Sequence, residues 1–318
     1  MTALAICSVM VTISPVQQQI GAYLAGLIEG DGSIKVPDNR ISSSGRWRYP
    51  TITIVFAAKD LPLAQLLAKI FLGKIAQGGT KANPGNWYVL TINRLASIYV
   101  IITLINGKMR TPKIEALNRL ISWFNAYILE SGAKQSFAPL TALPLDTSPF
   151  SSNGWLAGLL DADSNFYLTF QLNADQLATQ VQLYMRISQR QEYAHRVSAF
   201  PTSYVPLMES IAAFLSASFN VFTRERGNTT ENGCLIVAKS AISREALIGY
   251  LSVYPLLSSK HLDYLDWVSA HNLRTDKATR TVDGTATLQS LKSGMNDSRT
   301  RFDWSHLDTL LKESDAKA

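Results

Sequence analysis

The sequence is poor in cysteine. Its 318 residues contain only Cys7 and Cys234. Two cysteines so far apart frame neither a multi-disulfide scaffold nor a zinc site, so small disulfide-stapled domains and zinc fingers are excluded. This scarcity is typical of a protein that works in a reducing compartment.

Long apolar runs are also missing. Residues 1–13 are apolar and uncharged, and residues 96–105 form a second apolar run. Both are shorter than the ~20 residues that a membrane-spanning helix needs. The first run also lacks the basic start of a secretion signal and the arginines of a transit peptide. We therefore expect no membrane partner, treat 1–13 as an apolar leader without an assigned role, and expect 96–105 to lie in a buried helix.

Charged residues make up 17% of the chain, against 47% hydrophobic residues, and the net charge is +6. The chain is long and apolar enough for a large core and two similar subdomains. The positive charge is uneven, because residues 1–130 carry clearly more bases than acids and residues 131–270 carry slightly more acids. A basic excess suits a polyanionic partner without proving one.

What the chain does contain is a repeat. Residues 23–33 read YLAGLIEGDGS, and residues 155–165 read WLAGLLDADSN. The copies are too far apart for a solenoid repeat, so they indicate a duplicated half-domain. Each has small residues four apart, which lie on one face of a helix and let two helix backbones pack closely.

Each copy ends in two acids at i and i+2, where the helix should stop. Two such helices packed together would bring Asp31 and Asp163 close, at the negative ends of two helix dipoles. Like charges so placed retain a proton or recruit a cation, and hard divalent cations bind carboxylate and carbonyl oxygens. One copy alone is more often an ordinary buried helix with an acidic end. Two equivalent copies favour a metal-assisted hydrolase site.

The other acid of each copy, Glu29 or Asp161, lies two residues earlier. On a helix that step points about 200° away from the final acid. We therefore expect these two acids to matter less for the chemistry.

The two segments, LAGLIEGDG and LAGLLDADS, resemble the motifs of the LAGLIDADG homing endonucleases, in the single-chain form with two motifs. The resemblance implies metal binding by Asp31 and Asp163, with help from the backbone carbonyls of Gly30 and Ala162. It implies two or three Mg²⁺ ions, for which Mn²⁺ or Ca²⁺ can substitute in binding. Ser164 replaces the usual glycine, and we expect little loss because serine can end a helix.

The predicted fold class is α+β, with two pseudo-symmetric αββαββα half-domains at 14–130 and 153–271. A linker at 131–152, rich in Pro, Ser and Thr, joins them, and 272–318 is a polar tail with one short helix near 302–311. The resemblance implies that the two motif helices pack at the interface between the half-domains and that the antiparallel sheets form a DNA-binding saddle.

Alternating apolar residues predict the strands. In the strand at 49–58 we expect Ile52, Ile54, Phe56 and Ala58 to face inward, and in the strand at 179–189 Val181, Leu183, Met185 and Ile187. The other predicted strands are 33–36, 73–79, 87–92, 165–172, 218–226 and 234–239. Predicted helices after the motifs are 61–71, 95–105, 112–128, 243–253 and 259–271.

Counting along both halves pairs four further polar residues. Lys59 and Gln189 each end the second strand, and Lys113 and Lys260 each open the last helix. Residues 191–205 account for the extra length of the second half. The resemblance implies that Lys113 and Lys260 are active-site lysines, and that Lys59 and Gln189 hold the solvent shell.

Outward polar side chains on the sheets and basic residues of the sheets and their loops are the candidate DNA contacts, since alternating side chains can read base edges in the major groove while basic residues bind phosphates. For each basic residue, a solvated loop position without DNA contact is the alternative. They are Lys35, Arg40, Arg46, Arg48, Thr51, Thr53, Lys81, Tyr167, Gln180, Gln182, Tyr184, Arg186, Arg224 and Arg226.

The resemblance implies a monomer that cuts both strands of a long pseudo-palindromic DNA target and leaves 3′ overhangs. It also implies an organellar intron gene, with the mitochondrion favoured over the chloroplast. An RNA maturase that helps its host intron splice is a rival, although loss of an acid would have favoured it more. The tripeptide Asp161-Ala162-Asp163 also matches the glycosyltransferase DxD metal motif, but no nucleotide-sugar fold precedes it.

Overall fold

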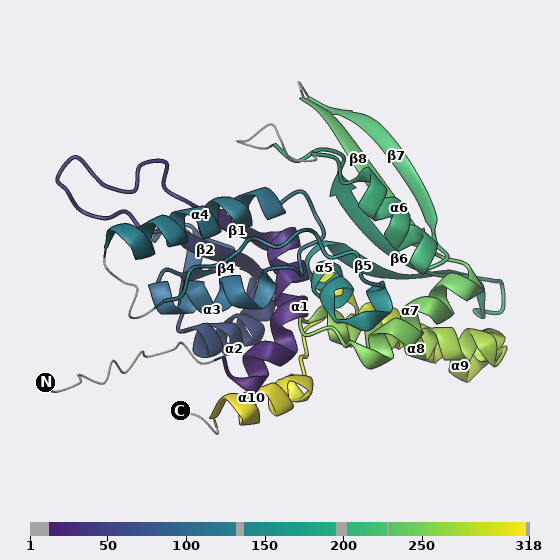
Figure 1. Ribbon diagram of the computed structural model, residues 1–318. Coiled ribbons are helices and arrows are strands. Elements are labelled where there is room, and N and C mark those ends of the chain that lie inside the picture. The colour runs from purple at the N-terminus through teal and green to yellow at the C-terminus, as the bar shows by residue number, and fades with distance from the viewer. Residues whose placement is uncertain (1–12, 132–136, 195–201, 228, 316–318) are drawn as a thin grey trace, which may run out of the picture. The chain divides into compact units, whose positions relative to one another are not determined.

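The computed structural model describes residues 13–131, 137–194, 202–227 and 229–315 (Figure 1). Most of the predicted leader, residues 1–12, lies outside this range. The chain divides into two compact units. The first contains the described residues up to Ser148 and those from Thr309 on, and the second contains the described residues from Pro149 to Asp308. The division after Ser148 falls inside the predicted linker. Among the described residues, no helix combines the length and apolarity needed to cross a bilayer.

The first unit has the order αββαββα with a trailing helix, as the sequence predicts. Its antiparallel sheet has the strand order β1-β2-β4-β3. The elements are α1 (Pro15–Asp31), β1 (Gly32–Lys35), β2 (Thr51–Ala57), α2 (Leu61–Phe71), β3 (Lys74–Gly79), β4 (Pro84–Ile92), α3 (Leu95–Ile105) and α4 (Ile114–Glu130).

Helix α1 begins and ends on local sequence signals. Ser14 caps its first turn, Gln17 completes a capping box with Ser14, and Pro15 takes the permitted first position. The helix ends at Asp31 because Gly32 turns into the extended conformation and starts β1. The motif acid therefore stands where helix becomes strand.

Strand β2 alternates as predicted in its middle and differs at its ends. Ile52, Ile54 and Phe56 are buried. The strand begins at Thr51 rather than residue 49, and a short 3₁₀ helix, Ala58–Asp60, follows it, so the prediction that Ala58 faces inward within the strand is wrong.

The turn of the hairpin between β3 and β4 lies at 80–83, where the Thr80 N–H donates to the Asn83 carbonyl at 3.0 Å.

The second unit repeats the plan, with strand order β5-β6-β8-β7. Helix α6, for which the sequence prediction gave no range, fills the place that α2 holds in the first unit. The elements are α5 (Trp155–Asp163), β5 (Ser164–Leu172), β6 (Ala178–Arg190), α6 (Val205–Phe214), β7 (Ser218–Arg226), β8 (Thr229–Ala238), α7 (Ala241–Val253) and α8 (Lys260–Thr275). Part of the predicted insertion, 195–201, lies outside the described residues.

A bulge breaks the alternation of β6 near its start. Gln180 has φ +49°, in the left-handed region, and the pairing of β5 with β6 shifts register opposite it. Leu183, Met185 and Ile187 are buried as predicted, whereas Val181, beside the bulge, is only partly buried.

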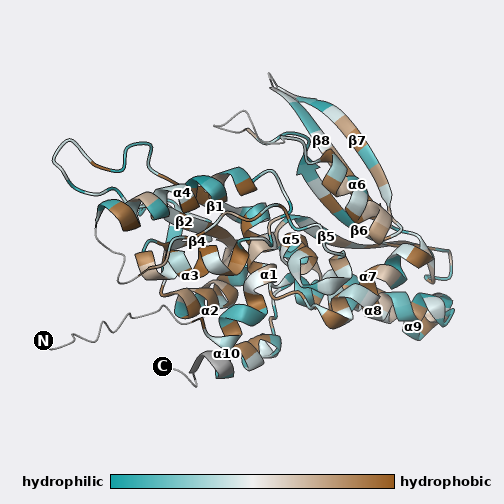
Figure 2. Cartoon of the chain, in the orientation of Figure 1, coloured by the Kyte–Doolittle hydropathy of each residue, from teal (hydrophilic) through white to brown (hydrophobic). Residues whose placement is uncertain are grey.

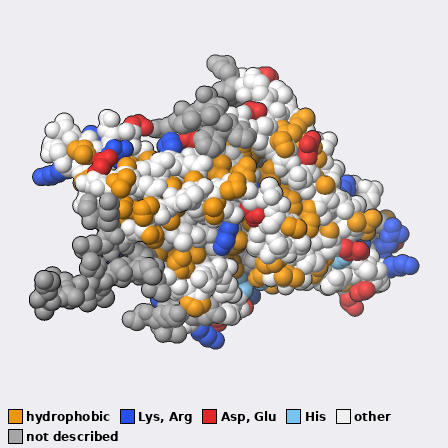
Figure 3. Space-filling view, in the orientation of Figure 1, with side chains coloured by type: hydrophobic (Ala, Val, Ile, Leu, Met, Phe, Trp, Pro, Cys, Tyr) orange, Lys and Arg blue, Asp and Glu red, His pale blue; other side chains and the backbone are white. Residues whose placement is uncertain are grey.

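The prediction of a single short helix in the C-terminal segment is wrong. Helix α9 (Val282–Ser293) packs against α8, and α10 (Asp308–Asp315) follows later. Sequence periodicity missed α9 because polar contacts hold it: the Thr285 hydroxyl accepts Ala178 N–H at 2.8 Å. Beyond α9, Arg299 bridges Asp263 and Asp266 at 2.9 and 2.6 Å. Figure 3 shows Lys and Arg side chains gathered where α8 and α9 lie.

Candidate active site

Each motif acid is the last residue of its helix. Asp31 is exposed at the end of α1, and Asp163 is partly exposed at the end of α5. The next residue differs between the halves. Gly32 lies so close to Ile28 that an added Cβ would stand 2.6 Å from the Ile28 Cα atom. Ser164 instead donates its hydroxyl to the Leu160 carbonyl at 2.6 Å, so its side chain satisfies a helix-end carbonyl.

The two predicted lysines lie against the ends of the motif helices. The Lys113 ammonium donates to the carbonyls of Ile28, Gly30 and Gly32 at 3.0, 3.3 and 2.9 Å. A cation at a helix C-terminus is favoured by the helix dipole and satisfies carbonyls that lack helical partners. Lys113 is 9% exposed.

The second half repeats this contact with its own lysine. Lys260 donates to the carbonyls of Leu160, Asp161 and Ala162 at 3.4, 2.6 and 2.9 Å. Sequence counting thus paired two residues that occupy the same place in the two units. Each lysine stands within hydrogen-bond distance of the carbonyl, Gly30 or Ala162, that the resemblance assigns to metal.

Glu29 and Asp161 lie away from the final acids, as the helical step predicts, and both are buried, at 1% and 5% exposure. The Glu29 carboxylate accepts backbone N–H groups of Arg110 and Thr111, and Asp161 accepts those of Leu257 and Ser258. Asp161 is therefore engaged inside the protein, which argues against the DxD reading. Sequence reasoning missed this role, although equal spacing in both motifs was a signal.

Gln189 and Lys59 occupy different settings. Gln189 Nε2 donates to Asp163 Oδ2 at 3.0 Å, so the end of β6 contacts the motif acid directly. Lys59 is partly exposed in the 3₁₀ helix after β2. The two residues that the sequence count treats as equivalent therefore lie in different structures: Gln189 is in a strand and Lys59 is in a 3₁₀ helix.

The oxygen atoms at each helix end fit a hard divalent cation. Each half offers one carboxylate, Asp31 or Asp163, beside one backbone carbonyl, Gly30 or Ala162, and Mg²⁺ and Ca²⁺ prefer such ligands with water. The part of the chain that the structure describes has no group of three or more His, Cys, Asp or Glu side chains suited to a metal. A site here would rest on few side chains, backbone oxygens and water. The pairing of Asp31 with Asp163 joins the two units and stays a prediction.

On the second sheet, three candidate DNA contacts form one cluster. The rings of Tyr167 and Tyr184 stack at 4.8 Å, and the Arg186 guanidinium lies 5.5 Å from the Tyr167 ring centre. All three are partly exposed. The stacking fixes the position of a cation on an accessible sheet face.

The remaining candidates of the second sheet are more varied. Gln180 is exposed at the bulge, and Gln182 accepts from the Lys239 ammonium at 3.2 Å. Arg224 pairs with Glu231 across the hairpin at 2.8 Å, and this hydrogen bond raises the pKa of Arg224. The side chain of Arg226 lies outside the described residues.

The first sheet has a more apolar accessible face. Lys35 pairs with Thr51, and Thr53 lies on the same face two residues along. That face continues through Val55 and, opposite Ala57, through Trp87; these are 45% and 42% exposed. Lys81 is exposed in the β3–β4 turn. Sequence reasoning missed the apolar pair because exposed hydrophobic residues carry no pattern of their own.

Two glycines, Gly78 and Gly85, leave the space that the Trp87 indole occupies. A Cβ at Gly78 would stand 1.9 Å from Trp87 Nε1, and one at Gly85 would stand 2.3 Å from the ring. Any side chain at either position would displace the indole. The indole therefore fills the space that side chains at these two positions would take.

The basic loop, residues 36–50, joins β1 to β2 and is largely hydrophilic (Figure 2). It carries the exposed candidates Arg46 and Arg48. Its two aromatic residues pack edge-on against α4, with Trp47 5.0 Å and Tyr49 6.1 Å from the Tyr127 ring. Arg40, also in this loop, forms an ion pair with Glu130 at 2.5 Å, with both side chains partly exposed.

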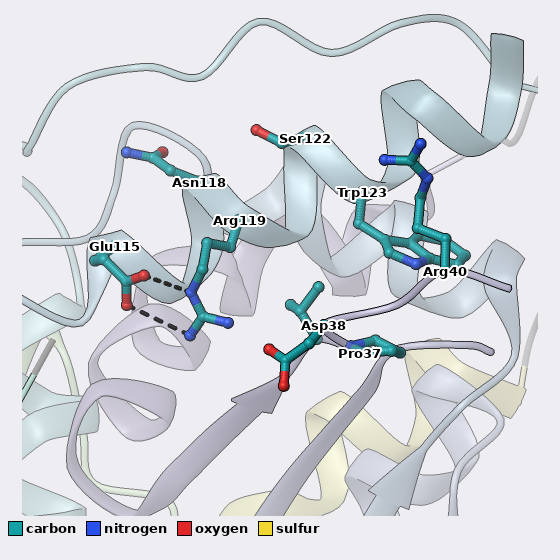
Figure 4. Close-up of a pocket in the computed structure, with 9 residues that line it drawn as sticks. Pro37, Asp38, Arg40, Glu115, Asn118, Arg119, Ser122 and Trp123 are labelled. Carbon is teal, nitrogen blue, oxygen red and sulfur yellow. Dashed lines mark hydrogen bonds and ion pairs between the residues drawn. The ribbon is translucent and has the colours of Figure 1, made fainter. Parts of the chain in front are cut away.

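A pocket of about 450 Å³ lies between α4 and the start of this loop (Figure 4). None of the candidate catalytic residues lines it, and Arg40 is the candidate DNA contact that does. Glu115 and Arg119 form an ion pair along its wall. Within the described residues, Asn118 Oδ1 and Trp123 Nε1 are buried without a hydrogen-bond partner.

The sequence profile of the LAGLIDADG endonuclease family matches residues 24–124 and 156–271, more than half of the chain. The chain is 33% identical over 314 residues to the intron-encoded DNA endonuclease aI3 of Saccharomyces cerevisiae, covering 93% of this chain and 74% of that protein. It is 29% identical over 271 residues to a protein of cox1 intron 2 of Schizosaccharomyces pombe, covering 85% and 71%.

Solved structures show the same fold. The structure of the LAGLIDADG homing endonuclease I-SmaMI bound to cleaved DNA superposes with a TM-score of 0.60 at 19% identity, covering 88% of this chain and 98% of that one. I-SmaMI bound to uncleaved DNA in the presence of calcium ions gives a TM-score of 0.57 at 19% identity, covering 87% and 98%.

Proposed function

The chain belongs to the LAGLIDADG endonuclease family, and from that membership we propose that it is a site-specific DNA endonuclease that uses divalent metal ions to cut both strands of a long duplex target. The observation that carries the proposal is the repetition of one arrangement. Each half ends its motif helix in an accessible acid, Asp31 or Asp163, and sets a lysine against the same helix end.

In this mechanism Asp31 and Asp163, with the carbonyls of Gly30 and Ala162, would hold the metal. When bound, a divalent cation would supply Lewis-acid chemistry that polarises the phosphate and activates water. The chain supplies the rest. Gln189 donates to the Asp163 carboxylate and so orients it, and Lys113 and Lys260, held against the two helix ends, would stabilise the negative charge that the phosphate gains.

The accessible sheet faces would read the DNA, and they differ in chemistry. Tyr167, Tyr184 and Arg186 offer a stacked cation, and arginine commonly reads guanine in the major groove. Val55 and Trp87 offer an apolar surface, which suits thymine methyl groups. We expect the two half-sites of the target to differ accordingly.

The same family membership supports an intron-encoded gene product that acts in the mitochondrion as a monomer and leaves 3′ overhangs. The relatives from Saccharomyces cerevisiae and Schizosaccharomyces pombe are both named for introns, and the second for cox1.

The deciding experiment selects cleaved molecules from a randomised duplex library in Mg²⁺ and maps the ends. We expect one recovered target with 3′ overhangs. Asp31→Asn and Asp163→Asn should bind it unchanged, yet lose cleavage by more than the roughly 10–100-fold that loss of an outer-shell partner costs.

Asp276→Asn is the matched control, because this exposed carboxylate lies past the far end of α8 from Lys260. It should cut like the parent. If both motif variants also cut like the parent, the nuclease mechanism fails. Binding of intron RNA by a chain that cuts no DNA would favour the maturase alternative.

A further inference from the structure

We propose that Glu29 and Asp161, the first acids of the two motifs, are positioning residues: each fixes the loop that carries the lysine of its own half and so sets where the ammonium stands. The inference rests on the proposed function, because the lysines matter through the cleavage reaction. It assigns separate tasks to the two acids of each motif.

The first half shows the network in full. Glu29 Oε1 accepts the Arg110 N–H at 3.0 Å, and the N–H and hydroxyl of Thr111 at 2.6 Å each. The same Thr111 hydroxyl accepts Lys113 N–H at 3.2 Å. One carboxylate thus controls the backbone up to the residue whose ammonium lies on the helix end.

The second half builds the same network from different side chains. Asp161 Oδ2 accepts the N–H groups of Leu257 and Ser258 at 2.7 and 3.1 Å, and Oδ1 accepts the Ser258 hydroxyl at 2.5 Å. The Ser258 hydroxyl accepts Lys260 N–H at 3.1 Å. In the second half Asp161 and Ser258 take the places that Glu29 and Thr111 hold in the first half. The same connection from acid to lysine is therefore made by different residue types.

The chain beyond each half supports the loop from the other side. The Arg110 guanidinium donates to Asp146 Oδ2 at 2.8 Å and to the Ser148 carbonyl at 2.6 Å. In the second half the Leu257 carbonyl lies 3.1 Å from His306 Nε2. Each loop is therefore fixed by an acid on one side and by a downstream residue on the other.

Removing one acid should release one lysine. Replacing a buried carboxylate by an amide removes the charge that strengthens its hydrogen bonds and puts an NH2 donor in place of one of its two acceptor oxygens. Glu29 uses both oxygens, since Oε2 also accepts the Arg110 N–H at 3.2 Å. In Glu29→Gln the Lys113 loop should loosen, whereas the Lys260 loop keeps its own acid.

The first test reads lysine position without cleavage. The full chain is treated with an amine-reactive ester, and labelled lysines are quantified by mass spectrometry. In the parent, Lys113 should react at least about tenfold more slowly than the exposed Lys81 and Lys277, since it is 9% exposed and bonded to three carbonyls. Glu29→Gln should speed labelling of Lys113 alone, and Asp161→Asn that of Lys260 alone.

Equal acceleration at both lysines in either variant would mean that the acid only stabilises the fold, and would overturn the proposal. Unchanged labelling would overturn it too. If Glu29→Gln does not fold, Thr111→Val breaks the same connection while keeping the acid, and should release Lys113 alone.

The second test is a double-mutant cycle of single-turnover cleavage on the selected target. Glu29→Gln should slow cleavage by about 10–100-fold with target affinity unchanged. In a Lys113→Met background it should add nothing, whereas in a Lys260→Met background its effect should remain. If the parent cuts DNA and the rate losses of Glu29→Gln and Lys113→Met multiply in the double variant, the inference is wrong. If the parent cuts no DNA, the proposed function is wrong instead. The labelling test does not depend on cleavage and still decides the inference in that case.

Discussion

Gln189 connects the second sheet to a motif acid, since its amide donates to Asp163 at 3.0 Å. Replacing it with glutamate would remove this donor and set a second negative charge beside that carboxylate, and the repulsion should disturb the position of the ligand. We expect Gln189→Glu to slow cleavage by about 10–100-fold and to leave nicked duplex, because each half serves one strand. Separating nicked from linear plasmid over time measures both effects.

The control for this prediction is Gln65→Glu. Gln65 is exposed on α2, which covers the opposite face of the first sheet from the candidate DNA contacts. The same change of charge there should leave rate and product ratio as in the parent. Equal rates for the Gln189 variant and the parent would remove Gln189 from the site.

Among the elements, the basic loop depends on its aromatic contacts with α4. Neutralising Arg46 and Arg48 should weaken all DNA binding and reduce the slope of log affinity against log salt by about 1.8. The melting temperature should hold, because exposed side chains contribute within about 0.5 kcal/mol. Gel shifts across a salt series test this, with Arg280→Gln plus Arg301→Gln as the control of equal charge.

The basic loop gives a second prediction, which concerns the packing of Trp47 rather than charge. Trp47→Ala removes edge contacts with Trp123 and Tyr127, and aromatic pairs contribute about 0.5–1.5 kcal/mol each. DNA affinity should fall although no charge is lost, while Arg46 and Arg48 remain. If affinity is unchanged, the loop does not need this anchor to reach DNA.

Sequence reasoning reached those elements whose signals are local. The repeated motif predicted α1 and α5, and alternation predicted the buried positions of β2 and β6. It missed α9, which Thr285 holds through a polar contact across the chain, and it missed the task of Glu29, which depends on a loop more than 80 residues away. Such contacts follow from how the chain returns on itself, which periodicity does not record.

At the scale of the whole molecule, stability should fall in mild acid. Burial first, and the nearby His306 second, lower the pKa of His261 from 6.5 to about 4. As the pH falls, the unfolded chain therefore binds this proton at a higher pH than the folded chain does. The contribution of His261 to the free energy of unfolding is fully present above pH 6.5 and is lost as the pH falls toward 4. Because the ring is partly exposed, we expect a loss of about 1 kcal/mol between pH 6.5 and 5.

Urea unfolding at pH 7, 6 and 5 measures that loss. His261→Phe keeps a ring against His306, which stacks on it at 4.3 Å, and removes the titrating group. The variant should show a flatter pH dependence over this window. A pH dependence equal to the parent's would assign the loss to other groups.

The hydrogen bonds of Glu29 end inside the first unit, and those of Asp161 end inside the second. Each half therefore carries the full set of contacts that place its own lysine. Half-domains exchanged between family members at the Ser148–Pro149 boundary would bring this arrangement with them. Recombination could then assemble new targets from old halves without rebuilding the catalytic geometry each time.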